Sequence, residues 1–249
     1  MRNFKATWHT SIKEIDKYAW SDLSKDNNPF YSWNWLSELE ISDSINAKKG
    51  WQPLHLSLSI DQKIIGIAPL YLKNHSYGEF IFDQSFLKLA NELGLNYYPK
   101  LIGMSPASPV EGYRFFISSK EDELEITTIM IKIIDNFAIN NGILSCNFLY
   151  VDPIWSQLAE QVNCAKWLNK NSFWSVSNQK TFADYLAGFN SNQRRNIKKE
   201  RKSILNSGIT ITTSLGKEID QKRMEKMHDL YELHCAKWGI WGSKYLTES

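Results

Sequence analysis

Residues 118–151, SSKEDELEITTIMIKIIDNFAINNGILSCNFLYV, decide the fold class of this chain. Ser118 and Ser119 are candidate N-caps, and the acidic residues after them favour the positive end of a helix. Gly142 ends the helical pattern, and the apolar run 143–151 predicts a buried, central strand. The buried stripe expected on the helix consists of Ile126, Ile129, Met130, Ile133, Ile134, Phe137 and Ala138.

The segments before this helix extend the pattern. Residues 113–117 predict a short strand, so a strand–helix–strand unit is expected, which is typical of a sheet covered by helices. Residues 54–60 alternate apolar and polar side chains and predict a half-buried strand, and residues 63–72 run back as a second one. Asn28-Pro29 and residues 86–93 predict further helices. The sequence therefore predicts an α/β (α+β) fold with a mixed sheet flanked by helices.

A second module is expected after residue 164, which divides the chain into domains 1–164 and 165–249. Thr181 and Ser191 are candidate caps of two helices, and the β-branched run 209–213 predicts a strand. A last helix is expected near 217–238, with a stripe of Met224, Met227, Tyr231, Cys235 and Trp238. This module has too few strands to complete a sheet. We therefore expect the second domain to be incomplete and the 249-residue chain to be inactive alone.

Composition limits the class of protein. A hydrophobic content of 43% with 22% charged residues is typical of a globular chain, and the net charge of +2 gives no overall reason to expect nucleic-acid binding. No apolar run approaches the ~20 residues of a membrane span, and the N-terminus lacks a signal-peptide pattern. The three cysteines contain no C-x-x-C pair, which indicates reduced thiols. We expect a cytoplasmic protein.

Residues 75–101, HSYGEFIFDQSFLKLANELGLNYYPKL, carry most of the candidate chemistry. If residues 80–82 form a strand, Glu79 and Asp83 lie on one face of it, with His75 in the preceding loop. That arrangement suggests a general base and the group that orients it. The alternative is a hydrogen-bonded loop with a solvated pair of acids.

The end of this stretch predicts a binding surface. Pro99 lacks an N–H donor, so the residues around it belong to an edge or to the start of a strand. Tyr97 and Tyr98 then point to opposite sides, and one of them can line a cleft beside Lys100, where an anionic or planar group would bind. The alternative is simple packing with a surface lysine.

A basic helix is expected in the second module. Residues 194–202 carry six positive charges and one negative charge. Arg194, Arg195 and Lys198 are candidates for contacts with phosphates of a nucleotide, an RNA backbone or an anionic lipid. The alternative is a solvated helix face.

Metal and nucleophile motifs are absent from the sequence. The five histidines do not cluster, and there is no H-x-x-x-H, C-x-x-C, Walker A, G-x-S-x-G or dinucleotide-binding glycine motif. No metal is expected.

Several pieces together resemble a bacterial family of predicted N-acyltransferases, described as peptidoglycan biosynthesis or recognition proteins and similar to the Fem-type aminoacyltransferases. The matching pieces span nearly the whole chain. They are NPF at 28–30, GWQPLHL at 50–56, PLYLK at 69–73, HSYGEFIFD at 75–83, YYPKL at 97–101, SNQRRNIKKER at 191–201, KWG at 237–239 and YLT at 245–247.

The resemblance implies tandem GNAT-type domains, the second incomplete, and transfer of an acyl or aminoacyl group to an amine. Acyl-CoA and aminoacyl-tRNA are the donors it implies, but no segment matches the Q/R-x-x-G-x-G/A loop that cradles the pyrophosphate of acetyl-CoA. The donor therefore stays open. The competing function is a non-catalytic module that binds an anionic glycan, lipid or RNA. Acceptor and oligomeric state are not indicated.

Overall fold

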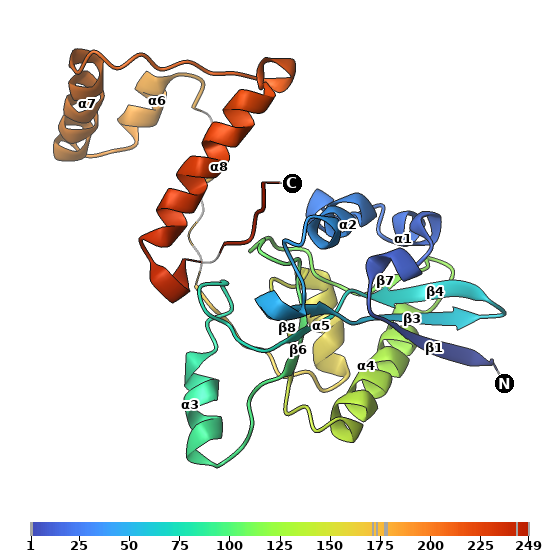
Figure 1. Cartoon of the computed structure of the whole chain (residues 1–249). Coiled ribbons are helices and arrows are strands. Elements are labelled where there is room, and N and C mark those ends of the chain that lie inside the picture. The colour runs from blue at the N-terminus through green and yellow to red at the C-terminus, as the bar shows by residue number, and fades with distance from the viewer. Residues whose placement is uncertain (1, 171, 173, 177–178, 243, 249) are drawn as a thin grey trace. The chain divides into compact units, whose positions relative to one another are not determined.

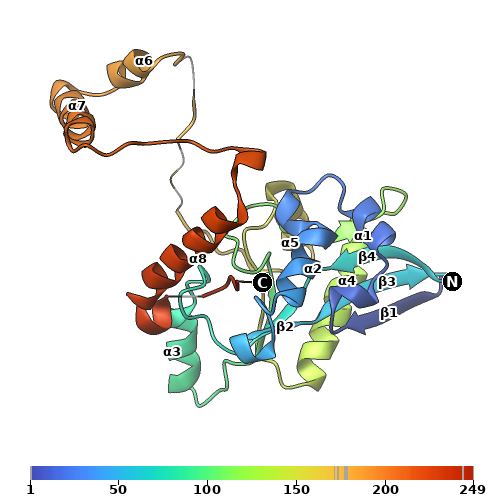
Figure 2. The ribbon, with the colours of Figure 1, turned by 45° about the horizontal axis from the view of Figure 1, so that its top comes forward.

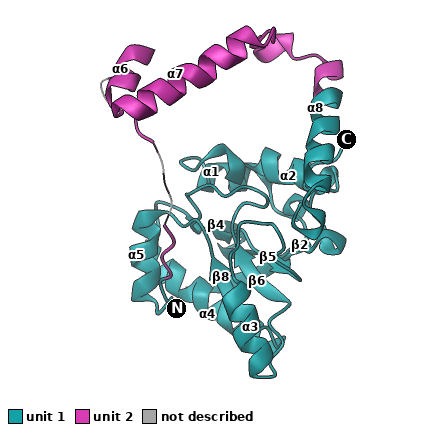
Figure 3. Ribbon diagram, turned by 90° about the vertical axis from the view of Figure 1, so that its left-hand side faces the viewer, with its two compact units in different colours: residues 1–166, 225–249 teal, residues 167–224 magenta. Residues whose placement is uncertain are grey.

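The computed structural model describes residues 2–170, 172, 174–176, 179–242 and 244–248. The chain divides by packing into two compact units, residues 1–166 with 225–249 and residues 167–224 (Figure 3). Residues 225–249 thus pack with the N-terminal unit. The division into two GNAT-like domains at residue 164 stays a prediction, because compact units need not coincide with domains of a family.

The strands of the first unit form two four-stranded ladders. One has the order β1 (Phe4–His9), β3 (His55–Ile60), β4 (Lys63–Ala68) and β7 (Phe116–Ile117). The other has the order β2 (Trp51–Pro53), β5 (Tyr71–Lys73), β6 (Lys100–Gly103) and β8 (Cys146–Phe148). All neighbours are antiparallel except β6 and β8, which are parallel. The expected mixed α/β fold is confirmed.

Pro69 divides the predicted strand 63–72 into β4 and β5. Proline has no N–H to donate to a ladder, so pairing stops there. The two ladders nevertheless continue into one another, because the Leu54 N–H donates to the Leu70 carbonyl oxygen at 2.9 Å.

Helices cover both faces of the first ladder (Figures 1 and 2). On one side lie α1 (Lys17–Leu23) and α2 (Trp33–Ile41), and on the other lies α4 (Glu123–Asn140). Trp20 packs edge-on against His55, whereas Ile126 and Met130 approach Gly66 from α4. This double cover explains why four consecutive residues of β3 are buried. The unit also contains α3 (Gln84–Glu92), α5 (Pro153–Gln161) and most of α8 (Gln221–Ala236).

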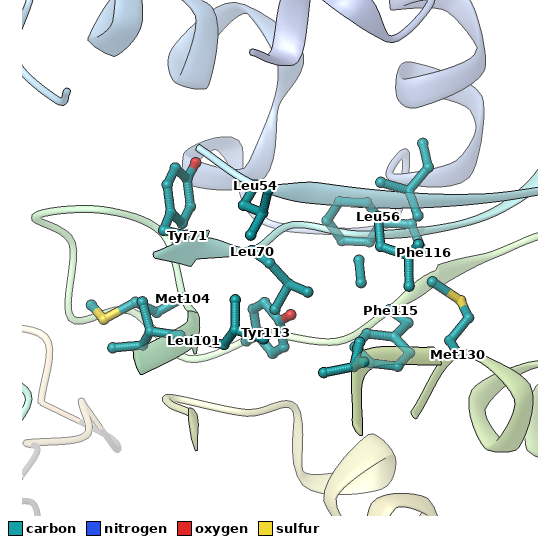
Figure 4. Close-up of a cluster of buried hydrophobic side chains, with 14 of the residues drawn as sticks. Leu54, Leu56, Leu70, Tyr71, Leu101, Met104, Tyr113, Phe115, Phe116 and Met130 are labelled. Atoms are coloured by element: carbon teal, nitrogen blue, oxygen red, sulfur yellow. The ribbon is translucent and has the colours of Figure 1, made fainter. Parts of the chain in front are cut away.

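One hydrophobic core serves both ladders. Figure 4 shows Leu56 of β3, Leu101 of β6 and Met130 of α4 in the same cluster. The predicted stripe of α4 is confirmed: three of its members, Ile126, Met130 and Ile134, are buried, and the other four pack partly buried against the core.

Local details of three helices differ from the sequence prediction. The N-cap of α4 is Asp122, which accepts the Glu125 N–H at 2.7 Å, so Ser118 and Ser119 do not cap it. The carboxylate lies one residue before the helix, where its oxygen reaches the third N–H. Asn28-Pro29 opens only a short 3₁₀ turn, Pro29–Tyr31, and α2 begins after Ser32.

The strand predicted at 143–151 is shorter than expected and is not central. Only Cys146–Phe148 form β8, which is the half-buried edge of its ladder. Tyr150 has a positive φ of 51°, which interrupts the extended backbone before the isolated bridge between Val151 and Tyr113. The strand predicted at 113–117 is likewise reduced to β7 and this bridge.

The second unit contains α6 (Phe182–Ala187) and α7 (Ser191–Asn206). Thr181 caps α6 as expected, but Asn190 rather than Ser191 caps α7, in a capping box with Gln193. The strand predicted at 209–213 is wrong: Ile209 and Ile211 are 64% and 74% exposed, and the described part of this unit contains no strand. A β-branched run forms a strand only where a neighbour pairs with it.

Candidate active site

Two buried lysines lie opposite each other on adjacent strands of the second ladder. Lys73 of β5 and Lys100 of β6 are register partners, and neither side chain is exposed. Like charges directly opposite each other destabilise a sheet, and a buried ammonium needs a counter-charge. Lys100 is one of the residues expected from the sequence, whereas Lys73 was not among the candidates. Only the register of β5 and β6 reveals it.

The loop between β5 and α3 supplies the two counter-charges. The expected strand at 80–82 is wrong, because Phe80 and Phe82 have positive φ values of 59° and 54° and the loop has no strand pairing. The alternation of the side chains is nevertheless as expected. Glu79 and Asp83 are buried, and the two phenylalanines between them are exposed.

Asp83 is held by several donors. It forms an ion pair with Lys100 and accepts hydrogen bonds from Ser76 Oγ at 3.0 Å and from the Tyr98 hydroxyl at 3.4 Å. Lys100 Nζ also donates to the Tyr97 hydroxyl at 3.2 Å. Burial alone would raise the pKa of Asp83, but the hydrogen bond and charge of Lys100 outweigh it and hold that pKa below its ordinary value.

Glu79 has fewer partners. It forms an ion pair with Lys73 and accepts a hydrogen bond from Trp51 Nε1 at 2.9 Å, while the Lys73 ammonium lies 4.0 Å from the centre of the Trp51 ring. Burial raises the pKa of Glu79, and Lys73 and Trp51 only partly offset this. Burial lowers the pKa of Lys73 to about 8.

The two carboxyl groups thus have pKa values shifted in opposite directions. A pair of this kind separates the group that exchanges protons near neutral pH from the group that stays ionised. By this criterion Glu79, whose pKa is raised, is the candidate for proton exchange, and Asp83, whose pKa is lowered, is the candidate charged partner.

Glu79 also lines a pocket of about 290 Å³ in the first unit. Of the six candidates between residues 75 and 100, His75 and Glu79 line this pocket, whereas Asp83, Tyr97, Tyr98 and Lys100 do not. The remaining lining residues are Ser44, Lys49, Trp51, Tyr77, Cys235, Ala236, Gly239, Ile240, Gly242, Lys244 and Tyr245.

His75 is fixed in the pocket wall by close packing. Its ring stacks on Tyr77 with 5.6 Å between centroids. Gly50 has φ +76°, and a Cβ there would lie 2.6 Å from His75 Nε2, so only glycine permits this approach. Burial and the nearby Lys73 charge lower the pKa of His75, which favours the neutral imidazole.

The C-terminal segment, residues 244–248, completes the pocket. The Tyr231 hydroxyl of α8 accepts the backbone N–H groups of Tyr245 at 2.5 Å and Leu246 at 3.2 Å. The Tyr245 hydroxyl donates to the Gly78 carbonyl oxygen at 2.9 Å, next to Glu79 in the sequence. Thr247 Oγ1 donates to the Ser42 carbonyl oxygen at 2.7 Å. Sequence reasoning missed this role because Gly78 and Tyr245 lie 167 positions apart.

A sequence profile of the FemAB-like family, described as peptidoglycan biosynthesis/recognition, matches residues 11–249. This chain belongs to the FemAB-like family. The resemblance noted from the sequence is therefore confirmed. No curated protein matches the chain.

Two solved N-acetyltransferases share a limited likeness with this FemAB-like chain. Aminoglycoside N-acetyltransferase AAC(6')-Iy, in complex with CoA, is 11% identical over 71% of this chain and 96% of its own, with a TM-score of 0.44. Ribosomal-protein-alanine N-acetyltransferase from Brucella melitensis biovar Abortus 2308 is 7% identical over 69% of this chain and 100% of its own, with a TM-score of 0.39. Likeness at this level carries no argument about the site.

The other expected binding residues lie on α7 of the second unit. Arg194 donates to the Phe189 carbonyl oxygen, and Arg195 donates to Asn192 Oδ1 at 2.8 Å. Lys198 lines a shallow surface depression with Lys199, Lys202, Ser203, Asn206 and Ser207. The lysines thus face solvent, while the two arginines make contacts within the unit.

Neither a metal site nor a membrane span is found in the described part of the FemAB-like chain. No group of three or more His, Cys, Asp or Glu side chains there could hold a metal ion. None of the described helices has the length and apolar character needed to cross a bilayer. The cytoplasmic location stays a prediction.

Proposed function

We propose that this FemAB-like protein transfers an acyl or aminoacyl group to an amine that binds in the pocket, with Glu79 as the general base. The observation that supports the proposal most is the Glu79 carboxyl group itself. It lines the pocket, its pKa is raised by burial, and it is oriented by Trp51 and Lys73. A base with a pKa moved toward neutral is suited to removing a proton from an ammonium group.

The reaction would proceed in two proton transfers and one acyl transfer. Glu79 takes one proton from the ammonium of the acceptor, and the freed nitrogen attacks the acyl carbonyl carbon of the donor. The new C–N bond forms as the C–S bond of a thioester or the C–O bond of an ester breaks. The second proton of the nitrogen passes to the leaving sulfur or oxygen. Backbone N–H groups would stabilise the oxyanion.

The surrounding residues would have positioning roles. Lys73 and Trp51 hold both carboxylate oxygens of Glu79, and the Lys73 charge limits how far burial raises its pKa. Asp83 and Lys100 do not line the pocket, and they fix the loop that carries Glu79. The resemblance to Fem-type enzymes favours acyl-CoA or aminoacyl-tRNA as donor, and the experiment below includes both.

The test combines transfer and binding. The native chain and Glu79→Gln are incubated with acyl-CoA and aminoacyl-tRNA donors and a panel of amines, and product is measured by mass spectrometry. Glu38→Gln, an exposed carboxyl group outside the pocket, serves as the matched control. We expect Glu79→Gln, but not Glu38→Gln, to lower transfer at least about a hundredfold. Amine binding without transfer would restrict this chain to an acceptor site. The absence of both amine binding and transfer would refute the proposal.

The test measures amine binding as well as transfer because a chain that is inactive alone, as predicted from the sequence, can still bind the acceptor. The pocket is lined entirely by residues of the first unit, so binding requires nothing from residues 167–224.

The second candidate function is binding of an anionic glycan, lipid or RNA by α7. The observation in its favour is the row of lysines beside one depression, with Lys198 and Lys202 one helical turn apart. RNA is the simplest probe. We expect the affinity of single-stranded RNA to fall steeply with salt, and Lys198→Ala with Lys202→Ala to reduce that salt dependence. RNA binding that does not depend on salt would show that α7 is not an RNA-binding surface. So would a double variant whose RNA affinity depends on salt as steeply as that of the native chain.

A further inference from the structure

We infer that the acceptor is an amine that also carries an anionic group, a carboxylate or a phosphate, and that Lys49 recognises this group. The inference rests on the proposed function, because it assigns a substrate class to the same pocket.

Lys49 is the unneutralised cation of the pocket wall. It ends the 3₁₀ turn Ala47–Lys49, where its backbone N–H donates to Asn46 Oδ1 at 2.9 Å, and its side chain is half-buried and lines the pocket. Among the residues that the structure describes, no carboxylate forms an ion pair with its ammonium. Lys244, the other lysine of the lining, pairs with Glu232 at 3.1 Å.

The charges of the pocket therefore have a definite arrangement. The charge of Glu79 is balanced by Lys73, which does not line the pocket. The net charge presented to a ligand comes from Lys49. A plain ammonium would be repelled by it, whereas a ligand with an additional anionic group would place that group on Lys49 and its amine on Glu79.

Lys49 and Glu79 are held by the same short segment of chain. Gly50 follows Lys49 and packs against His75, and Trp51 comes next and donates to Glu79. This connection fixes the backbone of the anion-binding residue relative to the carboxylate that would receive the ammonium. His75 Nδ1 is buried without a partner among the described residues, which leaves a further polar atom in the same wall.

The size of the pocket favours a small group. A volume of about 290 Å³ lies just below the range of typical ligand pockets, ~300–1,000 Å³. A free amino-acid-sized molecule, or an end group of that size on a longer molecule, fits this space.

The test uses pairs of amines that differ only in the anionic group. Binding to the native chain is measured by isothermal titration calorimetry for lysine against cadaverine and for phosphoethanolamine against ethanolamine. The first pair tests a carboxylate and the second a phosphate. We expect at least one anionic member to bind about tenfold more tightly than its partner, as is typical of one charge-assisted contact.

The role of Lys49 is tested by substitution. Lys49→Met should reduce the preference to about twofold or less, whereas Lys48→Met, an exposed neighbour outside the lining, should keep it. Equal binding within both pairs, or an unchanged preference in Lys49→Met, would overturn the inference. So would a loss of CoA affinity in Lys49→Met with the amine preference intact, because Lys49 would then contact the donor.

The result also separates this inference from the proposed function. Transfer to cadaverine as efficient as transfer to lysine would leave the acyltransferase proposal standing and refute the role of Lys49. Lys49-dependent binding of anionic amines without transfer from any donor would refute the reaction for this chain and leave the recognition standing.

Discussion

The two buried ion pairs of the first unit, Glu79 with Lys73 and Asp83 with Lys100, have the same chemistry but different environments. Their carboxylates lie four positions apart on one loop, and their lysines are register partners on adjacent strands. Asp83 has hydroxyl donors in addition to its lysine and lies away from the pocket, and its pKa is lowered. Glu79 has one indole donor and lines the pocket, and its pKa is raised.

This difference shows that a buried ion pair does not by itself indicate whether its carboxylate is structural or catalytic. Burial raises the pKa of both carboxyl groups, and the direction of the net shift depends on whether the paired lysine and the other hydrogen-bond donors outweigh burial. The pair with more donors holds the loop in place. The pair with fewer donors lies next to the pocket, where the proposed function requires proton exchange. The five predictions below test this separation.

The largest effect is expected from Asp83→Asn. This change leaves the Lys100 ammonium buried without its counter-charge, which typically costs about 3–5 kcal/mol of unfolding free energy. Urea unfolding followed by circular dichroism at pH 7 measures it. The exposed Asp22→Asn should stay within about 0.5 kcal/mol of the native chain. A loss below about 1 kcal/mol in Asp83→Asn would contradict a structural role for this pair.

The pH dependence gives a second readout of the same residue. The pKa of Asp83 is lowered in the folded state, so its stabilisation is present at neutral pH and is lost as the pH falls below about 4 through the folded pKa. The unfolding free energy of Asp83→Asn should therefore fall less between neutral and acidic pH than that of the native chain. Replacing the whole pair, in Asp83→Asn with Lys100→Met, should recover part of the lost free energy.

Glu79→Gln should separate activity from stability. We expect transfer to fall at least about a hundredfold, the usual loss on removing a general base. The unfolding free energy should fall by only about 1 kcal/mol at pH 7, because burial already lowers the pKa of Lys73 to about 8 and the lysine can release its proton at a small cost. Turnover assays and urea unfolding on the same sample measure both quantities. If activity is lost only in proportion to the loss of folded protein, Glu79 is a structural residue like Asp83.

Lys73→Met should change the pH profile of transfer. The Lys73 charge lowers the pKa of Glu79, so its removal should move the acidic limb of kcat/KM to higher pH. A set of rates between pH 5 and 9 measures the shift. A limb that stays in place, or moves to lower pH, would show that Glu79 is not the group that titrates.

The smallest effect is expected from Tyr245→Phe, which removes the hydrogen bond to Gly78. One neutral hydrogen bond contributes about 1 kcal/mol, so kcat should fall by about three- to tenfold, with faster amide hydrogen exchange at residues 78–80. Tyr18→Phe, at a site 83% exposed, is the control and should change neither. Unchanged exchange in Tyr245→Phe would mean that the C-terminal segment does not hold the loop.

The sequence by itself determined the features that depend on neighbours along the chain. The stripe of α4 follows from helical spacing, and the cap of α6 follows from Thr181 and Asp184. That Glu79 and Asp83 lie on the same side was also predicted, although the backbone there is a loop with positive φ and not a strand. Membership of the FemAB-like family was evident from short matching pieces spread over the chain.

The tertiary structure alone decided which of these residues share a site. The Lys73–Lys100 pairing depends on the register of β5 and β6, and the contact of Tyr245 with Gly78 depends on a chain that returns after 167 residues. The expected strand at 209–213 failed for the same reason, since a strand requires a partner that local sequence does not supply. Burial and pKa are set by neighbours through space, so the opposite shifts of Glu79 and Asp83 could not be read from their similar side chains.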